Sequence, residues 1–268
     1  MLPRIFAILF LLAPAAAFAQ APVSMHARYE TYAAGVHVAD VETGFDFSPR
    51  AYRMSLAYRT TGMVALLFGG HQFDTVLGSW NGGQPAPVRF LGQGAWRGVD
   101  WVADIEYRQS KPFVRQLIPA ITDEREPVPD SLQTNSIDTL SALAMLIRSV
   151  ATTGRCETAV RTFDGRRALE IEAHTAGNEH LASSPRSTFH GSALRCDFSG
   201  RMLAGFKFDG DRMRDGKPMH GSAWLAAVVP GGPMLPVRMA FETRWFGDAV
   251  MYLTEIGQGS DLHAARGD

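Results

Sequence analysis

Hydrophobic and polar side chains alternate along most of this chain, and the alternation predicts a β-rich fold. Two stretches show it best, AYRMSLAYRT (51–60) and VRMAFETRWF (237–246). A period of two places every second side chain on the same face, so both stretches are predicted to be half-buried antiparallel strands. Their apolar faces carry Tyr52, Met54, Leu56 and Tyr58 in the first stretch and Val237, Met239, Phe241 and Trp245 in the second.

The first sixty residues predict a three-stranded meander. In VHVADVETGFDF (36–47) the apolar positions change phase partway along, which predicts a one-residue bulge near Ala39-Asp40. Gly35 before this stretch and the Ser-Pro-Arg corner at 48–50 after it supply residues typical of hairpin turns.

The next segment, TGMVALLFGG (61–70), breaks the alternation with a compact apolar cluster. It is consistent with a buried corner of the core, which we favour, and alternatively with a short helical turn or an apolar lip at the rim of the sheet. Further along, Asp164-Gly165 lies between two strand-like stretches and predicts a hairpin.

One segment, residues 137–152, is predicted to be a long α-helix, because its apolar residues recur at helical spacing. Ser136 is the predicted N-cap, and Gly154 follows the last turn as the expected stop. The stretch before the helix, 122–130, is acidic and contains prolines, so it is a connection and not a central strand.

Together these elements predict one mainly β domain, built as a single curled antiparallel sheet or as an open, barrel-like sheet. The helix at 137–152 would lie across the concave apolar face of the sheet as a plug or lid. The domain is expected to span residues 20–256, followed by a polar, flexible tail at 257–268.

The first nineteen residues are typical of a secretory signal. Arg4 precedes an apolar run, and the small-x-small pattern at 17–19 predicts cleavage after Ala19. A membrane anchor is disfavoured, because Pro14 interrupts the run and a span needs roughly 20 apolar residues. We therefore expect a periplasmic protein whose mature chain has no transmembrane segment.

Composition and charge exclude some partners. The chain is 46% hydrophobic and 20% charged, which is ordinary for a globular protein. Its formal net charge is −1, and loss of Arg4 with the signal would make it one unit more negative. Nucleic-acid binding needs a concentrated positive field, so no nucleic acid is expected as a partner.

Cys156 and Cys196 are the two cysteines of the chain. An exported chain meets an oxidising compartment, so a disulfide between them is expected, with two buried free thiols as the alternative. The bond would close a loop of about 41 residues and contribute roughly 4 kcal/mol in the chain-entropy model. It would fasten the strand that leaves the helix to a nearby strand.

Five pieces of sequence, in this order, resemble a family of exported bacterial proteins catalogued as domain of unknown function 3108. The resemblance covers most of the mature chain, although Ala39-Asp40 stands where such sequences are expected to have a glycine. It implies a single periplasmic β-domain of a Gram-negative cell, with no established activity and no catalytic residues to carry over. The pieces are YETYAAGVHVADVETGFDFSPRAYRMSLAYRTTGMVALLF, SIDTLSALAMLIRSV, AVRTFDGRRALEIE, ALRCDFSGRMLAGF and PVRMAFET.

The sequence contains no convincing catalytic or metal-binding motif. No two of its eight histidines have the spacing of two or four residues that would aim both at one metal ion. His174, His180 and His190 lie near a hairpin connection, where solvated side chains are the better interpretation. The common hydrolase signatures are missing, and Glu170 and Glu172 fit the polar face of a strand. Neither a cofactor nor a catalytic residue is predicted.

The apolar strand faces suggest a binding function. Ordinary core is the favoured interpretation of these residues, and a cavity for an acyl chain or an apolar peptide is the alternative. We expect non-enzymatic binding of a lipid, another hydrophobic ligand or an envelope protein partner. A hydrolase acting on an envelope glycan or lipid and a structural partner in an envelope assembly are the other possibilities. The predicted lining residues are Tyr52, Met54, Leu56, Tyr58, Met239, Phe241 and Trp245.

Overall fold

The computed structural model describes residues 23–120, 124–243 and 247–262. Four helices lie in these ranges: α1 (Gly62–Phe68), α2 (Asp130–Gln133), α3 (Thr139–Thr153) and α4 (Arg212–Asp215). The strands are β1 (Val23–Ala33), β2 (Val36–Phe47), β3 (Ala51–Thr60), β4 (Gly70–Asn81), β5 (Gln84–Trp96), β6 (Val99–Arg108), β7 (Lys111–Ile118), β8 (Thr158–Phe163), β9 (Ala168–Leu181), β10 (Gly191–Ala204), β11 (Met219–Ala227), β12 (Met234–Thr243) and β13 (Gly247–Gln258).

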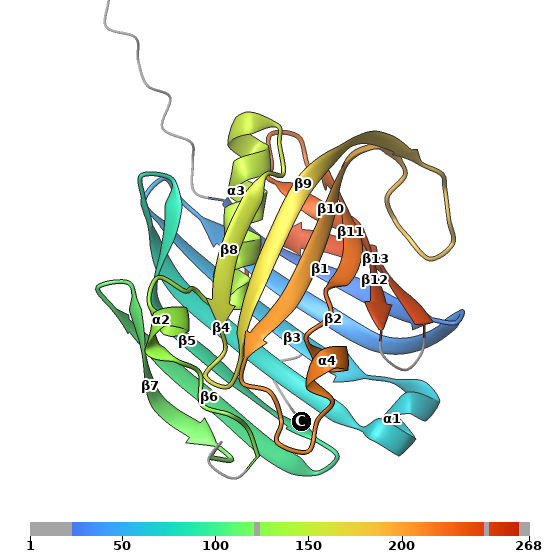
Figure 1. Ribbon diagram of the computed structural model, residues 1–268. Helices are drawn as coiled ribbons and strands as arrows, with labels where there is room; N and C mark the ends of the chain where they lie inside the picture. The colour runs from blue at the N-terminus through green and yellow to red at the C-terminus, as the bar shows by residue number, and fades with distance from the viewer. Residues whose placement is uncertain (1–22, 121–123, 244–246, 263–268) are drawn as a thin grey trace, which may run out of the picture.

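All thirteen strands belong to one antiparallel sheet, in the order β7-β6-β5-β4-β3-β2-β1-β13-β12-β11-β10-β9-β8. The first and last strands pair at its centre, and from there each half of the chain forms a meander toward one edge. The sheet curls into a barrel-like shape with α3 inside its curve (Figure 1). Helix α3 contacts β3, β4 and β5 in one half and β8 and β12 in the other. The predicted mainly β fold with a covering helix is confirmed.

The helix begins two residues later than predicted. Asp138, and not Ser136, is the N-cap, and its side chain accepts a hydrogen bond from Ser141 N. Ile137 is not helical, because its backbone forms an isolated bridge to Thr162 of β8. The predicted stop is correct: Gly154 adopts the left-handed conformation (φ 68°) that favours glycine.

The predicted meander is present as β1, β2 and β3, with one bulge between β1 and β2. His37 pairs with Tyr32 and Ala39 pairs with Thr31, so Val38 is the extra residue. The bulge therefore lies one position before the predicted Ala39-Asp40. The phase change of the apolar pattern located the bulge to within one residue.

Our interpretation of residues 61–70 as a buried corner is wrong. They form α1, a short helix at the rim of the sheet, whose Met63, Leu66 and Leu67 are 74%, 84% and 67% exposed. The two strands that flank it stay paired up to Arg59 and His71, so the helix extends beyond the sheet and has no core to reach.

The two edges of the sheet approach each other at the β8–β9 hairpin, which turns at Asp164-Gly165 as predicted. Arg166, directly after the turn, donates hydrogen bonds to the carbonyl oxygens of Ile118 (2.6 Å) and Pro119 (2.8 Å) at the end of β7. These contacts join the two meanders across the seam that the hydrogen-bonded ladder leaves open.

The end of the domain differs from the predicted boundary at 256. Strand β13 runs to Gln258, the side chain of Ser260 donates to Asp46 at 2.6 Å, and Leu262 is buried. Residues 257–262 therefore pack on the domain and are not a flexible tail. The predicted signal at 1–19 and residues 263–268 lie outside the described residues. Across the described ranges, every helix is too short or too polar to cross a lipid bilayer.

Candidate functional site

A buried chain of polar groups anchors the first turn of α3 to the inner face of the sheet. Ser141 donates from its hydroxyl to Asp138 Oδ2 at 2.6 Å and from its backbone nitrogen to Oδ1 at 2.8 Å. The hydroxyl oxygens of Tyr52 and Ser141 lie 2.7 Å apart. Because the single hydroxyl proton of Ser141 points to the carboxylate, Tyr52 is the donor in this second bond.

Burial raises the pKa values of ionisable groups in and around this polar network. Asp138 is 1% exposed, and desolvation raises its pKa to about 6 against the opposing effect of the bonds from Ser141. Desolvation also raises the pKa of Asp74, on β4, to about 7. The hydroxyl of Tyr107 is buried and, among the described residues, has no hydrogen-bond partner. Its pKa is raised well above the usual value, mainly by burial and also by the charge of Asp138.

The hydrogen-bonded network of Tyr52, Ser141 and Asp138 positions a helix and does not present a nucleophile. Ser141 is fully buried, and its proton is directed to the same carboxylate that caps α3. A catalytic serine needs an adjacent base and room for a substrate carbonyl. The arrangement is that of a structural polar network.

Trp80, at the end of β4, contacts both Tyr52 of the polar network and Arg148 near the end of α3. Its ring centroid lies 4.6 Å from that of Tyr52 and 6.4 Å from that of Phe47. On α3, the guanidinium carbon of Arg148 lies 4.5 Å from the centroid of the Trp80 ring. This is the distance of a cation–π contact, which fixes the arginine side chain against the indole.

A cavity of about 310 Å³ opens beside these residues, at the end of the barrel where α3 ends. Of the described residues that line it, Arg148 alone carries a charge, and Ser48 and Thr152 add hydroxyl groups. Trp80 Nε1 is buried and has no hydrogen-bond partner among the described residues. The apolar wall consists of Val23, Phe47, Pro49, Trp80, Ile147, Ala151, Pro233 and Met234.

A second, wider cavity of about 1010 Å³ lies at the seam between the two meanders. Its wall is rich in hydroxyl and amide groups from α2 and the connection to α3, and Tyr107 lies on its inner side. The guanidinium of Arg161 donates to the carbonyl oxygen of Ser131 at 3.1 Å. Apolar side chains, among them Val88 and Met145, share the lining with these polar groups.

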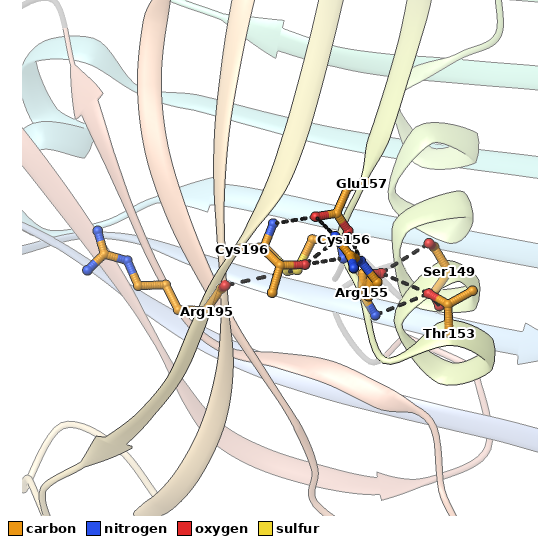
Figure 2. Close-up of polar contacts among 8 residues, drawn as sticks. Ser149, Thr153, Arg155, Cys156, Glu157, Arg195 and Cys196 are labelled. Atoms are coloured by element: carbon orange, nitrogen blue, oxygen red, sulfur yellow. Dashed lines mark hydrogen bonds and ion pairs between the residues drawn. A yellow bond between two sulfur atoms is a disulfide. The ribbon is translucent and has the colours of Figure 1, made fainter.

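The predicted disulfide is confirmed, and it pins the C-terminal end of α3. Cys156 and Cys196 are joined, with their Cα atoms 5.7 Å apart and both side chains fully buried. Figure 2 shows the bond running from the chain just after α3 to β10, with the bonds of Arg155 to Glu157 beside it. Since β9 separates β8 from β10, the bond ties the helix end to a strand that the ladder does not pair with β8.

The histidines do not form a metal centre in the described parts of the chain, where no three potential ligands are grouped suitably. His174 pairs across the ladder with Asp197 of β10. That carboxylate accepts hydrogen bonds from Arg195 (2.7 Å) and Ser222 (2.6 Å), and these bonds lower its pKa although partial burial opposes them. Arg195, Asp197 and Ser222 therefore form a surface hydrogen-bond network.

Comparison with known families decides what the chain is. The model of the family described as "Protein of unknown function (DUF3108)" matches residues 28–254. The chain belongs to the DUF3108 family. The resemblance seen in the sequence is thus confirmed, while a comparison with curated proteins found no match.

Among solved structures, this DUF3108 domain is similar to a β-barrel-like protein of domain of unknown function DUF1849 from Brucella abortus. The identity is 10% and the TM-score 0.50, over 88% of this chain and 98% of the other. At this identity the likeness concerns the fold alone. It supports the description of the sheet as barrel-like.

The predicted lining residues that the structure describes lie on the inner face, but none of them lines the 310 Å³ cavity. Tyr52 and Met54 are 2% and 0% exposed and belong to the core, where Tyr52 also bonds to Ser141. Four others, Leu56, Tyr58, Met239 and Phe241, are half-buried. Trp245 lies outside the described residues. A role of these residues in ligand binding stays a prediction.

Sequence reasoning missed Trp80, Arg148 and Met234. Trp80 ends an alternating strand, and Arg148 is a polar residue within the predicted helix at 137–152. They meet because the ends of β4 and α3 and the start of β12 come together at one end of the barrel. No local sequence pattern predicts that these three segments come together.

Proposed function

We propose that this DUF3108 protein is a non-enzymatic binding protein that holds a hydrophobic ligand in the 310 Å³ cavity beside α3. The observation that carries the proposal is the apolar wall at the open end of the barrel, formed by Phe47, Ile147 and Met234 with few polar groups. Small-molecule sites are commonly concave and mostly apolar, with volumes of about 300–1,000 Å³.

Two further features support binding. Helix α3, which forms one wall, is held at its start by the bonds of Ser141 and at its end by the Cys156–Cys196 bond. A wall that is already ordered reduces the entropy lost when a ligand binds. The buried Asp138–Ser141 pair, in contrast, leaves no accessible nucleophile in this chain of bonds, so an envelope hydrolase is the weaker proposal.

The proposal includes a location outside the cytoplasm. Residues 1–19 have the pattern of a secretory signal. A buried disulfide in a domain of this size is typical of proteins that fold in an oxidising compartment. Both observations support a periplasmic protein, where an apolar compound needs a carrier to cross water.

The test is native mass spectrometry, with solvent extraction and lipid analysis, on mature protein purified from a periplasm without detergent. We expect a stoichiometric apolar adduct on the wild type. Ala151 is exposed on α3 and lines the cavity, so Ala151→Trp should fill the cavity and remove the adduct without disturbing the core.

The matched control is Thr139→Trp, at an exposed position on the same helix that does not line the cavity. This variant should keep the adduct. An adduct that persists on Ala151→Trp would place the ligand elsewhere. Wild-type protein that carries no adduct and also binds no added decanol would refute the proposed function.

A further inference from the structure

We infer that the ligand of this cavity is an anionic amphiphile whose acidic group is bound by Arg148. The inference rests on the proposed function and adds the chemical class of the ligand. It follows from the combination of one cation and apolar walls in a single cavity.

Arg148 carries a charge that has no anionic partner within residues 23–120, 124–243 and 247–262. Among the described residues it forms no ion pair, and its guanidinium is stacked on Trp80 at 4.5 Å. Some other arginines of this chain bond to carboxylates, as Arg155 does to Glu157 at 3.1 Å, and others donate to carbonyl oxygens, as Arg166 does to Ile118. A stacked guanidinium keeps its N–H groups free at the edge, where they can bind an oxyanion in a bidentate manner.

Trp80 positions the arginine in the same wall. The indole ring lies against the Arg148 guanidinium at 4.5 Å and lines the cavity. The stacked pair therefore forms one unit at the cavity, with the charge held beside the apolar wall.

The apolar wall accounts for the rest of the ligand. Phe47, Ile147 and Met234 offer no charged partner, so the part that they contact must be hydrocarbon-like. A fatty-acid carboxylate and an alkyl phosphate share the required chemistry, an oxyanion on an apolar chain. The ligand would therefore place its oxyanion at Arg148 and its hydrocarbon part against the apolar wall.

The experiment compares decanoate, decyl phosphate and decanol on delipidated full-length mature protein by isothermal titration calorimetry. All three share the alkyl chain, so their differences isolate the head group. We expect the wild type to bind the anions roughly tenfold to a hundredfold more tightly than decanol, as charged hydrogen bonds allow. The tighter of the two anions identifies a carboxylate or a phosphate as the preferred group.

The variants are Arg148→Gln and Arg148→Lys, with Arg201→Gln as the control. Arg201 lies in an exposed ion pair with Glu170, so its loss removes one charge far from the cavity. Arg148→Gln should abolish the preference for anions and leave decanol binding within about twofold, because the apolar wall is retained. Arg148→Lys should keep part of the preference, and Arg201→Gln all of it.

The outcomes separate this inference from the proposed function. If decanol binds the wild type as tightly as decanoate, or Arg148→Gln keeps the preference for anions, the anionic class is wrong and the hydrophobic site remains. If none of the three compounds binds the wild type, the proposed function itself fails. Circular dichroism and thermal melting of each variant establish that the fold is intact.

Discussion

Replacing the buried carboxyl of Asp138 by an amide should change how the stability of the protein depends on pH. Asp138 is 1% exposed and accepts two hydrogen bonds from Ser141. In Asp138→Asn the amide oxygen can still accept from the backbone of Ser141, so the N-cap is retained. The amide nitrogen can donate to the hydroxyl oxygen, which then donates to Tyr52. The substitution therefore removes the charge and keeps the chain of bonds.

The magnitude follows from the raised pKa. Burial moves the pKa of Asp138 from 3.8 to about 6, so between these values the folded state binds more protons than the unfolded state. The stability contributed by this group is therefore fully present below pH 3.8 and is lost as the pH rises toward 6. At about 1.4 kcal/mol for each pKa unit, the loss attributable to Asp138 is ~3 kcal/mol. The variant has no such ionisation.

The assay is urea denaturation of both proteins, with the disulfide oxidised, at a series of pH values from 4 to 8. Subtracting the two free energies of unfolding cancels the effect of the surface carboxyls. The effect of Asp74 cancels only in part, because the charge of Asp138 contributes to its raised pKa. The wild type should lose ~2.4 kcal/mol relative to Asp138→Asn across this window, because part of the total is already lost at pH 4. Asp211 is the matched control, because it caps α4 at an exposed position and Asp211→Asn should give a curve parallel to the wild type. Parallel curves for Asp138→Asn would refute the reasoning.

Two further predictions concern stability. Replacing both Cys156 and Cys196 by alanine should lower the free energy of unfolding by roughly 4 kcal/mol, measured by urea denaturation against the oxidised wild type. An unchanged midpoint after reduction of the wild type would contradict it. Leu66→Ser should leave the melting temperature unchanged, because the side chain is 84% exposed, whereas Leu225→Ala, at a fully buried position, should cost about 2–5 kcal/mol. Equal melting temperatures for the two variants would contradict that assignment of burial.

The local elements of the fold were predictable because their signals are local. Period-two alternation located the first three strands, and helical spacing located α3 to within two residues at its start. The N-cap was misplaced because Ser136 and Asp138 are both good caps. Only the bridge from Ile137 to Thr162, made with a strand later in the chain, keeps residue 137 out of the helix.

The long-range features had no such signal. Pairing of β1 with β13 joins residues more than 200 positions apart, and no alternation pattern states which strand lies next to which. Residues 61–70 have the composition of a core segment, but whether a core lies within reach depends on the register of β3 and β4. The cavity was missed for the same reason, since Trp80 and Arg148 become neighbours only when the barrel curls.

The two ends of α3 are held in different ways, and the cavities beside them differ accordingly. At its start, α3 is bonded tightly to the sheet through Asp138 and Ser141, and the wider cavity there has many hydroxyl and amide groups in its wall. At its end, the Cys156–Cys196 bond holds α3 from the β10 side. The wall between Arg148 and Met234 faces the 310 Å³ cavity there. Reduction of the disulfide frees the cavity wall, whereas loss of the Tyr52 hydroxyl loosens the opposite end. Ligand affinity should therefore fall more on reduction than in Tyr52→Phe, although both changes destabilise the fold.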